Sequence, residues 1–249
     1  MQYKRIIIVL AVIALSSCSQ EKEKQNFSLK GNINGLKKGT VYLQKQQDTS
    51  LITLDSLVIN GQSSFELKTT LDEPELLYLK LDKNDNDEGN ILFFADKGIT
   101  EISSTLKNFG YDAKIVGSEQ QEVLEEYLLM MSKFNDRNLE MIKESLESQK
   151  AADTTKINSL QTDFDNLLKR KYLYTINFAI NHKDSEVSPY LTISEIPNTS
   201  IKFLKQIYGA LDEKIKNSKY GKELEELIEI REKSEDTIKT SEDTIKINE

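Results

Sequence analysis

Few residues in this chain could carry chemistry. Its 249 residues include one cysteine, Cys18, which rules out an intrachain disulfide. They also include one histidine, His182, which leaves little material for a metal site or for catalysis built on several imidazoles. His182 lies in a polar stretch after a predicted helix, where a lone histidine is usually a solvated or capping residue. We therefore expect no catalytic residues, no cofactor-binding residues and no metal ligands.

Acidic residues gather in two places. The loop Asp82–Glu88 offers hard oxygen ligands for calcium, but neither register of it supplies the glycine and the glutamate that an EF-hand loop needs. A solvated hairpin tip is the interpretation that its turn residues favour. The run 222–229 has carboxylates at helical spacing, which more often form an outer helix face than an acid/base pair.

Cys18 follows a segment with the organisation of a bacterial export signal. Lys4 and Arg5 give a positive start, and residues 6–15 form an apolar run shorter than the roughly 20 residues of a membrane-spanning helix. The run leads into Leu15-Ser16-Ser17-Cys18, which resembles the lipobox of bacterial lipoproteins. The resemblance implies cleavage after residue 17 and lipidation of Cys18. The alternatives are an ordinary signal peptide with an incidental cysteine, or a structural buried cysteine.

A lipid on Cys18 would make the membrane a partner and would place the protein in the bacterial cell envelope. Several acyl chains give a stable anchor where a single chain is marginal. Ser19 beside the lipid resembles lipoproteins sent on to the outer membrane, facing either the periplasm or the outside. The formal net charge of −8 argues against nucleic acid as a partner, because phosphate backbones are bound by concentrated positive charge.

The apolar pattern divides the chain into an α+β protein. Residues 1–17 are the signal peptide and 18–26 a polar tether. Residues 27–117 alternate like an antiparallel, β-sandwich-like domain, with an Asn60-Gly61 hairpin and Pro74 at a strand start or edge. Residues 118–233 change to a helical period. Residues 234–249 contain an exact repeat of Ser-Glu-Asp-Thr-Ile-Lys, which we expect to form a frayed or disordered polar tail.

Within the helical region the pattern predicts a helix from 119 through 131 and a second short helix through 139–146 that ends near 151–152. A longer helix follows and runs toward residue 180. Ser118 is expected to cap the first helix, and either Asp153 or Thr154 the long one. Ser188-Pro189 predicts a cap followed by a first-turn proline, and Pro197 the end of that helix. Further helices are expected at 201–211 and 220–230, and Met130-Met131 is expected to fill core space.

Several short motifs carry a resemblance to a known family. They are Phe27-Ser28-Leu29-Lys30-Gly31, Gly39-Thr40-Val41-Tyr42-Leu43, Asp55-Ser56, Asn60-Gly61 with Phe65, Glu73-Pro74-Glu75 with Tyr78, Phe93-Phe94-Ala95-Asp96-Lys97-Gly98, and Val116-Gly117-Ser118. Together they resemble the β domain of unknown function 4369, which typically precedes a thioredoxin-like domain in lipid-anchored disulfide oxidoreductases of the cell envelope. Val187-Ser188-Pro189-Tyr190 and Ser218-Lys219-Tyr220-Gly221 look like the helical segment that such proteins carry between the two.

The resemblance implies a fold rather than a reaction. In such relatives the thioredoxin-like domain would start about where this sequence ends, and no second cysteine is present, so thiol-disulfide chemistry is not carried over. The leading hypothesis is a lipid-anchored envelope interaction module without catalysis of its own, with an envelope protein as a possible partner. The alternatives are an accessory of an envelope thiol-disulfide system with a separate thioredoxin-like partner and, more weakly, a glycan-binding protein or hydrolase.

Lipidation of Cys18 is directly measurable. We expect mass spectrometry of the mature protein to find residue 18 as the first residue, carrying a mass increment of several acyl chains, because the lipobox places the lipid on its thiol. A Cys18→Ser variant should lack the increment. An unmodified Cys18 side chain in a full-length cytosolic chain would contradict the prediction.

Overall fold

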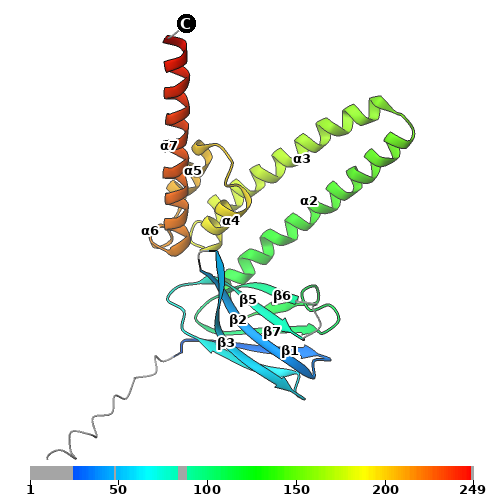
Figure 1. Cartoon of the computed structure of the whole chain (residues 1–249), viewed down its shortest axis with the longest axis vertical. Coiled ribbons are helices and arrows are strands. Elements are labelled where there is room, and N and C mark those ends of the chain that lie inside the picture. Colours follow the sequence, from blue (N-terminus) through cyan, green and yellow to red (C-terminus); the bar gives the residue numbers. More distant parts are fainter. Residues whose placement is uncertain (1–24, 48, 84–88, 248–249) are drawn as a thin grey trace, which may run out of the picture.

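The computed structural model describes residues 25–47, 49–83 and 89–247. Strands fill the first part of this range and helices the second, which confirms the predicted α+β class (Figure 1). Cys18, the signal peptide and most of the predicted tether lie outside the described residues, as do residues 84–88 of the loop considered for calcium.

The strands form two sheets with a common core. Sheet A has the order β4-β1-β7-β8 and sheet B the order β3-β2-β5-β6. Alternate residues of both sheets, such as Leu29 of β1 and Leu79 of β5, are fully buried between them, as expected for a sandwich. The strands are β1 (Phe27–Asn34), β2 (Lys38–Gln47), β3 (Ser50–Asn60), β4 (Ser64–Thr69), β5 (Glu75–Asp82), β6 (Gly89–Ala95), β7 (Gly98–Thr105) and β8 (Lys114–Val116).

Two strand pairings differ from those predicted. β1 and β7 run parallel, from Phe27↔Gly98 to Asn34↔Thr105. A parallel pair needs a long connection, and strands β2 to β6 supply it. The turn at Asn60-Gly61 also does not close a hairpin, because β4 pairs with β1 in the other sheet. The reason is burial: in sheet A the Phe65 ring can cover the space beside Gly31, where a Cβ atom would lie 2.0 Å from the ring.

Two long helices form a hairpin that projects from the body of the molecule (Figure 1). Ser118 and Asp153 cap their starts, as predicted, each accepting a hydrogen bond from a backbone N–H three residues later. The two separate helices predicted before residue 150 are one continuous helix, because no glycine or proline interrupts that stretch. The helices are α2 (Glu119–Lys150), α3 (Thr154–Asn181), α4 (Val187–Glu195), α5 (Ile201–Ala210), α6 (Glu213–Lys216) and α7 (Lys219–Ile247).

Two further predictions need correction. Ser188 does not cap α4, which begins one residue earlier; its buried hydroxyl instead donates to the carbonyl of Ala179 in α3. The backbone of the repeat tail is not frayed, since α7 continues to Ile247. The two six-residue copies start seven residues apart, close to two helical turns, and no proline or glycine follows Gly221. Among the described residues, no helix combines the length and apolar character needed to cross a membrane.

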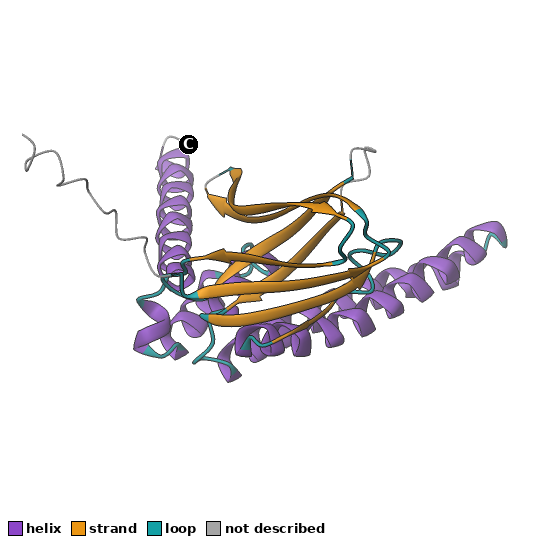
Figure 2. Ribbon diagram, turned by 90° about the horizontal axis from the view of Figure 1, so that it is seen from below, coloured by secondary structure: helices purple, strands orange, loops and turns teal. Residues whose placement is uncertain are grey.

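The helices gather on one side of the strands (Figure 2). Sheet B meets them through Leu76 and Phe94, which join a second hydrophobic cluster with side chains from α2, α3, α4 and α7. Met131 belongs to this cluster and Met130 packs against it, which confirms their predicted core-filling role. A third cluster lies wholly within the helices and includes Leu204 and Leu224.

Helices α6 and α7 approach closely at Gly221, so a substitution of this glycine tests their packing. A Cβ atom there would lie 2.0 Å from the carbonyl oxygen of Ile215, which is backbone and cannot turn aside. We expect Gly221→Ala to lower the free energy of unfolding by about 1–3 kcal/mol. The matched control is Gly209→Ala, at an exposed position of α5 where nothing lies within 4 Å of the added Cβ atom; it should raise stability by up to about 1 kcal/mol. Urea titrations of both variants measure the free energy of unfolding, and equal changes in the two would contradict the prediction.

A candidate binding cleft between the sheet and the helices

An aromatic cluster joins sheet B to the helical layer. The rings of Phe94 in β6, Tyr190 in α4 and Tyr220 in α7 meet edge to face, with centroids 5.5 to 5.7 Å apart. Such contacts add to the gain from burying the rings themselves. The three residues come from segments far apart in the sequence, so the cluster fixes where the sheet and the two helices meet.

Two backbone amides of sheet B are satisfied by helix side chains. The N–H of Leu76 donates to the Tyr220 hydroxyl at 3.1 Å, and the N–H of Phe94 donates to Oε1 of Gln121 at 2.8 Å. The ladder between β2 and β5 ends at Leu77, and β6 is the outer strand of its sheet, so no strand reaches these amides. A buried N–H without a partner is costly. The helices therefore complete the hydrogen bonding of the sheet.

A buried carboxylate lies beside this junction. Glu75, only 5% exposed, forms ion pairs with Lys45 of β2 at 3.1 Å and with Lys219 of α7 at 3.3 Å. The backbone N–H of Lys219 also donates to Oε2 of Glu73 at 2.9 Å. An acidic group at a helix start complements the free N–H groups there. These contacts hold the first turn of α7 against the start of β5.

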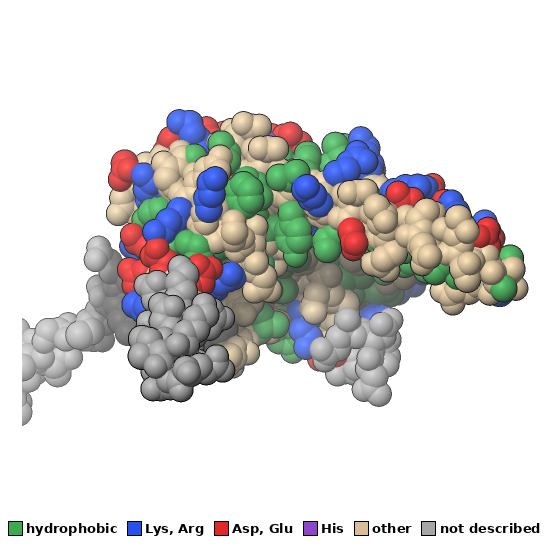
Figure 3. Space-filling model, turned by 90° about the horizontal axis from the view of Figure 1, so that it is seen from above, with side chains coloured by type: hydrophobic (Ala, Val, Ile, Leu, Met, Phe, Trp, Pro, Cys, Tyr) green, Lys and Arg blue, Asp and Glu red, His purple; other side chains and the backbone are tan. Residues whose placement is uncertain are grey.

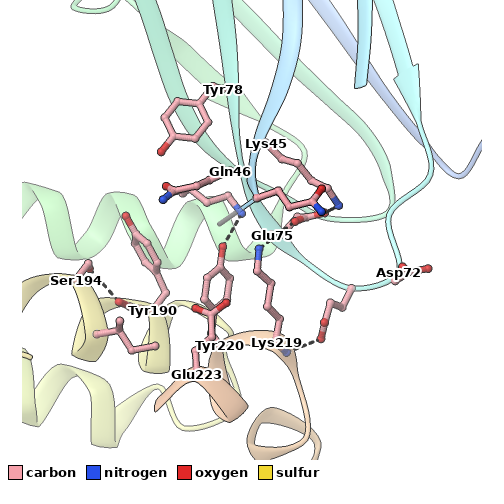
Figure 4. A pocket seen from close by; sticks show the side chains of 14 residues that line it. Lys45, Gln46, Asp72, Glu75, Tyr78, Tyr190, Ser194, Lys219, Tyr220 and Glu223 are labelled. Carbon is pink, nitrogen blue, oxygen red and sulfur yellow. Dashed lines mark hydrogen bonds and ion pairs between the residues drawn. The ribbon is translucent and has the colours of Figure 1, made fainter. Parts of the chain in front are cut away.

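The same residues line a cleft of about 710 Å³ (Figure 4). Figure 4 shows the side chains of Tyr78, Tyr190, Lys219 and Tyr220 around it, contributed by β5, α4 and α7. The rest of the lining comes mainly from β2 and from the segment between β4 and β5. We call this space the junction cleft; its lining residues are Lys45, Gln46, Gln47, Asp72, Glu73, Glu75, Leu76, Tyr78, Tyr190, Ile193, Ser194, Lys219, Tyr220 and Glu223.

A second pocket, of about 560 Å³, shares Asp72 and Glu73 with the junction cleft. One of its lining residues is Glu186, just before α4, which is 2% exposed and whose Oε2 has no hydrogen-bond partner among the described residues. Burial raises the pKa of the Glu186 carboxyl, while its interactions with Ser218 and Lys214 act in the opposite direction. We call this space the Glu186 pocket.

The residues singled out in the sequence do not meet in either space. Cys18 lies outside the described residues. His182 is the C-cap residue after α3, and its backbone N–H donates to the carbonyl of Phe178, which confirms the capping interpretation. Its ring stacks on the Phe178 ring. The run 222–229 presents carboxylates on the outer face of α7, as predicted, although Glu223 also lines the junction cleft. Among the described residues, no group of three or more His, Cys, Asp or Glu side chains is placed to hold a metal ion.

Sequence reasoning missed the residues that build the cleft, but it had a signal for them. Three motifs carry the family resemblance, but their sequence alone predicts no binding role for them: Glu73-Pro74-Glu75, Ser188-Pro189-Tyr190 and Ser218-Lys219-Tyr220. The structure brings all three to the junction. The signal was that motifs of the same family resemblance occur far apart in the sequence, which indicates that they meet at a common site.

Comparison with known proteins identifies part of the chain. Residues 27–124 match the family model of the Domain of unknown function (DUF4369). The match covers the sandwich and the first turns of α2, and so includes the sheet side of the junction cleft. Tyr190 and Lys219, on the helix side, lie beyond the matched DUF4369 region. No curated protein matches the chain in sequence.

The Tyr220 hydroxyl should matter for stability because it accepts from a buried amide. We expect Tyr220→Phe to lower the free energy of unfolding by about 1–3 kcal/mol, since the ring contacts stay while the N–H of Leu76 loses its partner. The control is Tyr111→Phe, because that side chain is 97% exposed; it should change stability by less than about 0.5 kcal/mol. Denaturant titrations compare the two, and equal losses would contradict the assigned role.

Proposed function

We propose that this protein is a lipid-anchored binding module of the outer membrane of the bacterial cell envelope, without catalysis of its own. Its partner or ligand binds in the junction cleft. The observation that carries the proposal is the cleft itself, whose walls come from β2, the segment before β5, β5, α4 and α7. Ligand sites favour concave junctions lined by aromatic and a few polar side chains.

The contacts around the cleft favour binding over acid/base catalysis. Glu75 is held by two lysines, and Glu73 accepts a hydrogen bond from the start of α7. Both carboxylates therefore have structural partners. Their oxygens are occupied by lysine side chains and by a backbone N–H, so neither carboxylate is free to face a substrate. Tyr78, Tyr190 and Tyr220 offer apolar surface together with hydroxyl groups, which suits recognition.

The envelope part of the proposal rests on the sequence. The charged start, the short apolar run and the lipobox-like residues 15–18 support export and lipidation, and Ser19 supports delivery to the outer membrane. A lipid on Cys18, followed by a short tether, would keep the protein close to the membrane. Its partner would then be a component of the envelope.

The second candidate is an accessory role in an envelope thiol-disulfide system, acting with a separate thioredoxin-like protein. The DUF4369 match at residues 27–124 favours it, in view of the resemblance to the β domain of envelope disulfide oxidoreductases. Deletion of the gene should then change the thiol status of envelope proteins. An unchanged thiol status would favour the binding module alone.

Site-specific photo-crosslinking tests the binding module. A benzophenone amino acid in place of Tyr78, which lines the cleft, should form a discrete adduct when the native host is irradiated. The same amino acid in place of Val58, a 70% exposed side chain of β3, is the control and should not form that adduct. Adducts from position 58 alone, or none from either position, would count against the junction cleft as the binding site.

A further inference from the structure

The Glu186 pocket has a surplus of acidic groups. Carboxylates reach it from the segment before β5, from the turn after β6, from the start of α2 and from the loop before α4. The acidic lining residues are Asp72, Glu73, Asp96, Glu119 and Glu186, while the basic ones among the described residues are Lys97 and Lys214. Acidic and basic side chains are intermingled over the face of the molecule in Figure 3. In the pocket, by contrast, the acidic lining residues outnumber the basic ones.

Some of these carboxylates already have partners. Oδ2 of Asp96 accepts from the Ser118 hydroxyl at 2.8 Å and from the N–H of Gln120 at 3.1 Å, and Glu73 accepts from the N–H of Lys219. Glu186 is different, because its Oε2 is enclosed and has no partner among the described residues. A buried charge is costly unless it is paired. The pocket thus has room, several acidic groups and a buried carboxylate with one oxygen that has no hydrogen-bond partner among the described residues.

We propose that the Glu186 pocket binds the ammonium or guanidinium group of a basic side chain on a partner polypeptide. The inference rests on the proposed function and deepens it by naming the chemistry of the partner. Asp72 and Glu73 line both spaces, so a peptide whose neighbouring residues occupy the junction cleft can place a lysine or arginine beside Glu186. An organic cation fits better than a metal ion, since the described acidic residues include no group placed to hold a metal.

Lys214 in the same pocket allows the direction of each substitution's effect on cation affinity to be predicted. A cation that enters pairs with Glu186 but is repelled by Lys214, whose positive charge already acts on the Glu186 carboxyl. Loss of the carboxylate should therefore weaken binding, and loss of the lysine should strengthen it. A merely structural role for Glu186 predicts neither change.

A pair of peptides that differ in one charge tests the proposal. The probes are acetylated Ala-Ala-Lys-Ala-Ala amide and its twin with norleucine, which keeps the aliphatic stem and lacks the ammonium group. Calorimetric titration of the intact protein in a neutral detergent should give binding of the lysine peptide that weakens with added salt. The norleucine peptide should bind about tenfold more weakly or not at all.

Three variants locate the site. Glu186→Gln should weaken binding of the lysine peptide by about tenfold, and Lys214→Met should tighten it by about twofold to fivefold. The control, Glu140→Gln, alters an exposed carboxylate of α2 and should leave affinity unchanged. An unchanged urea midpoint, or a higher one, shows that Glu186→Gln is folded.

The peptide titrations and the photo-crosslinking test the two sites separately. Equal affinity for the two peptides, no binding of either, or full affinity in Glu186→Gln would overturn the cation pocket and leave the photo-crosslinking result at Tyr78 untouched. An absent adduct at Tyr78 together with charge-dependent peptide binding would instead overturn the junction cleft as the main site and keep the Glu186 pocket.

Discussion

The arrangement of this protein depends on two backbone amides that no strand can reach. Leu76 and Phe94 are partners across β5 and β6, at the end of sheet B where β2 no longer pairs. Their N–H groups are buried and need acceptors. Tyr220 and Gln121 supply them from two different helices, which ties α7 and α2 to one pair of residues in the sheet. The position of the helical layer follows from this requirement.

The junction cleft is a consequence of the same contacts. Once Tyr220 is fixed on Leu76, the preceding residue, Lys219, lies beside Glu75, and the ion pair between them follows. Lys45 reaches the same carboxylate from β2. The result is a buried charge with two partners at the edge of an open space, held by elements that are themselves well packed. Rigid support of this kind is what a binding site needs, because little ordering cost remains when a ligand arrives.

Local signals predicted much of the fold, and contacts distant in the sequence account for the rest. Ser118 and Asp153 act as caps because a cap depends only on the next few residues. The parallel pairing of β1 with β7 depends on where seven strands have been placed, which no local pattern records. Ser188 has the residue type of a cap, but its hydroxyl is used by a carbonyl of α3. The cleft was missed for the same reason, since the hydrogen bond between Leu76 and Tyr220 spans 144 residues.

The division between the two walls of the cleft bears on specificity. The DUF4369 match ends at residue 124, so it includes Glu75 and Leu76 but neither Tyr190, Glu186 nor Lys219. The sheet wall presents the Glu75 carboxylate and the backbone N–H of Leu76, which needs an acceptor from a helix. This wall therefore serves to hold the helices in place. The helix wall supplies Glu223 and two of the three aromatic rings of the junction cleft. It also supplies Glu186 of the adjoining pocket, whose Oε2 has no hydrogen-bond partner among the described residues. If the cleft binds a ligand as proposed, the sheet would set where it binds, and the helices would set which ligand it is.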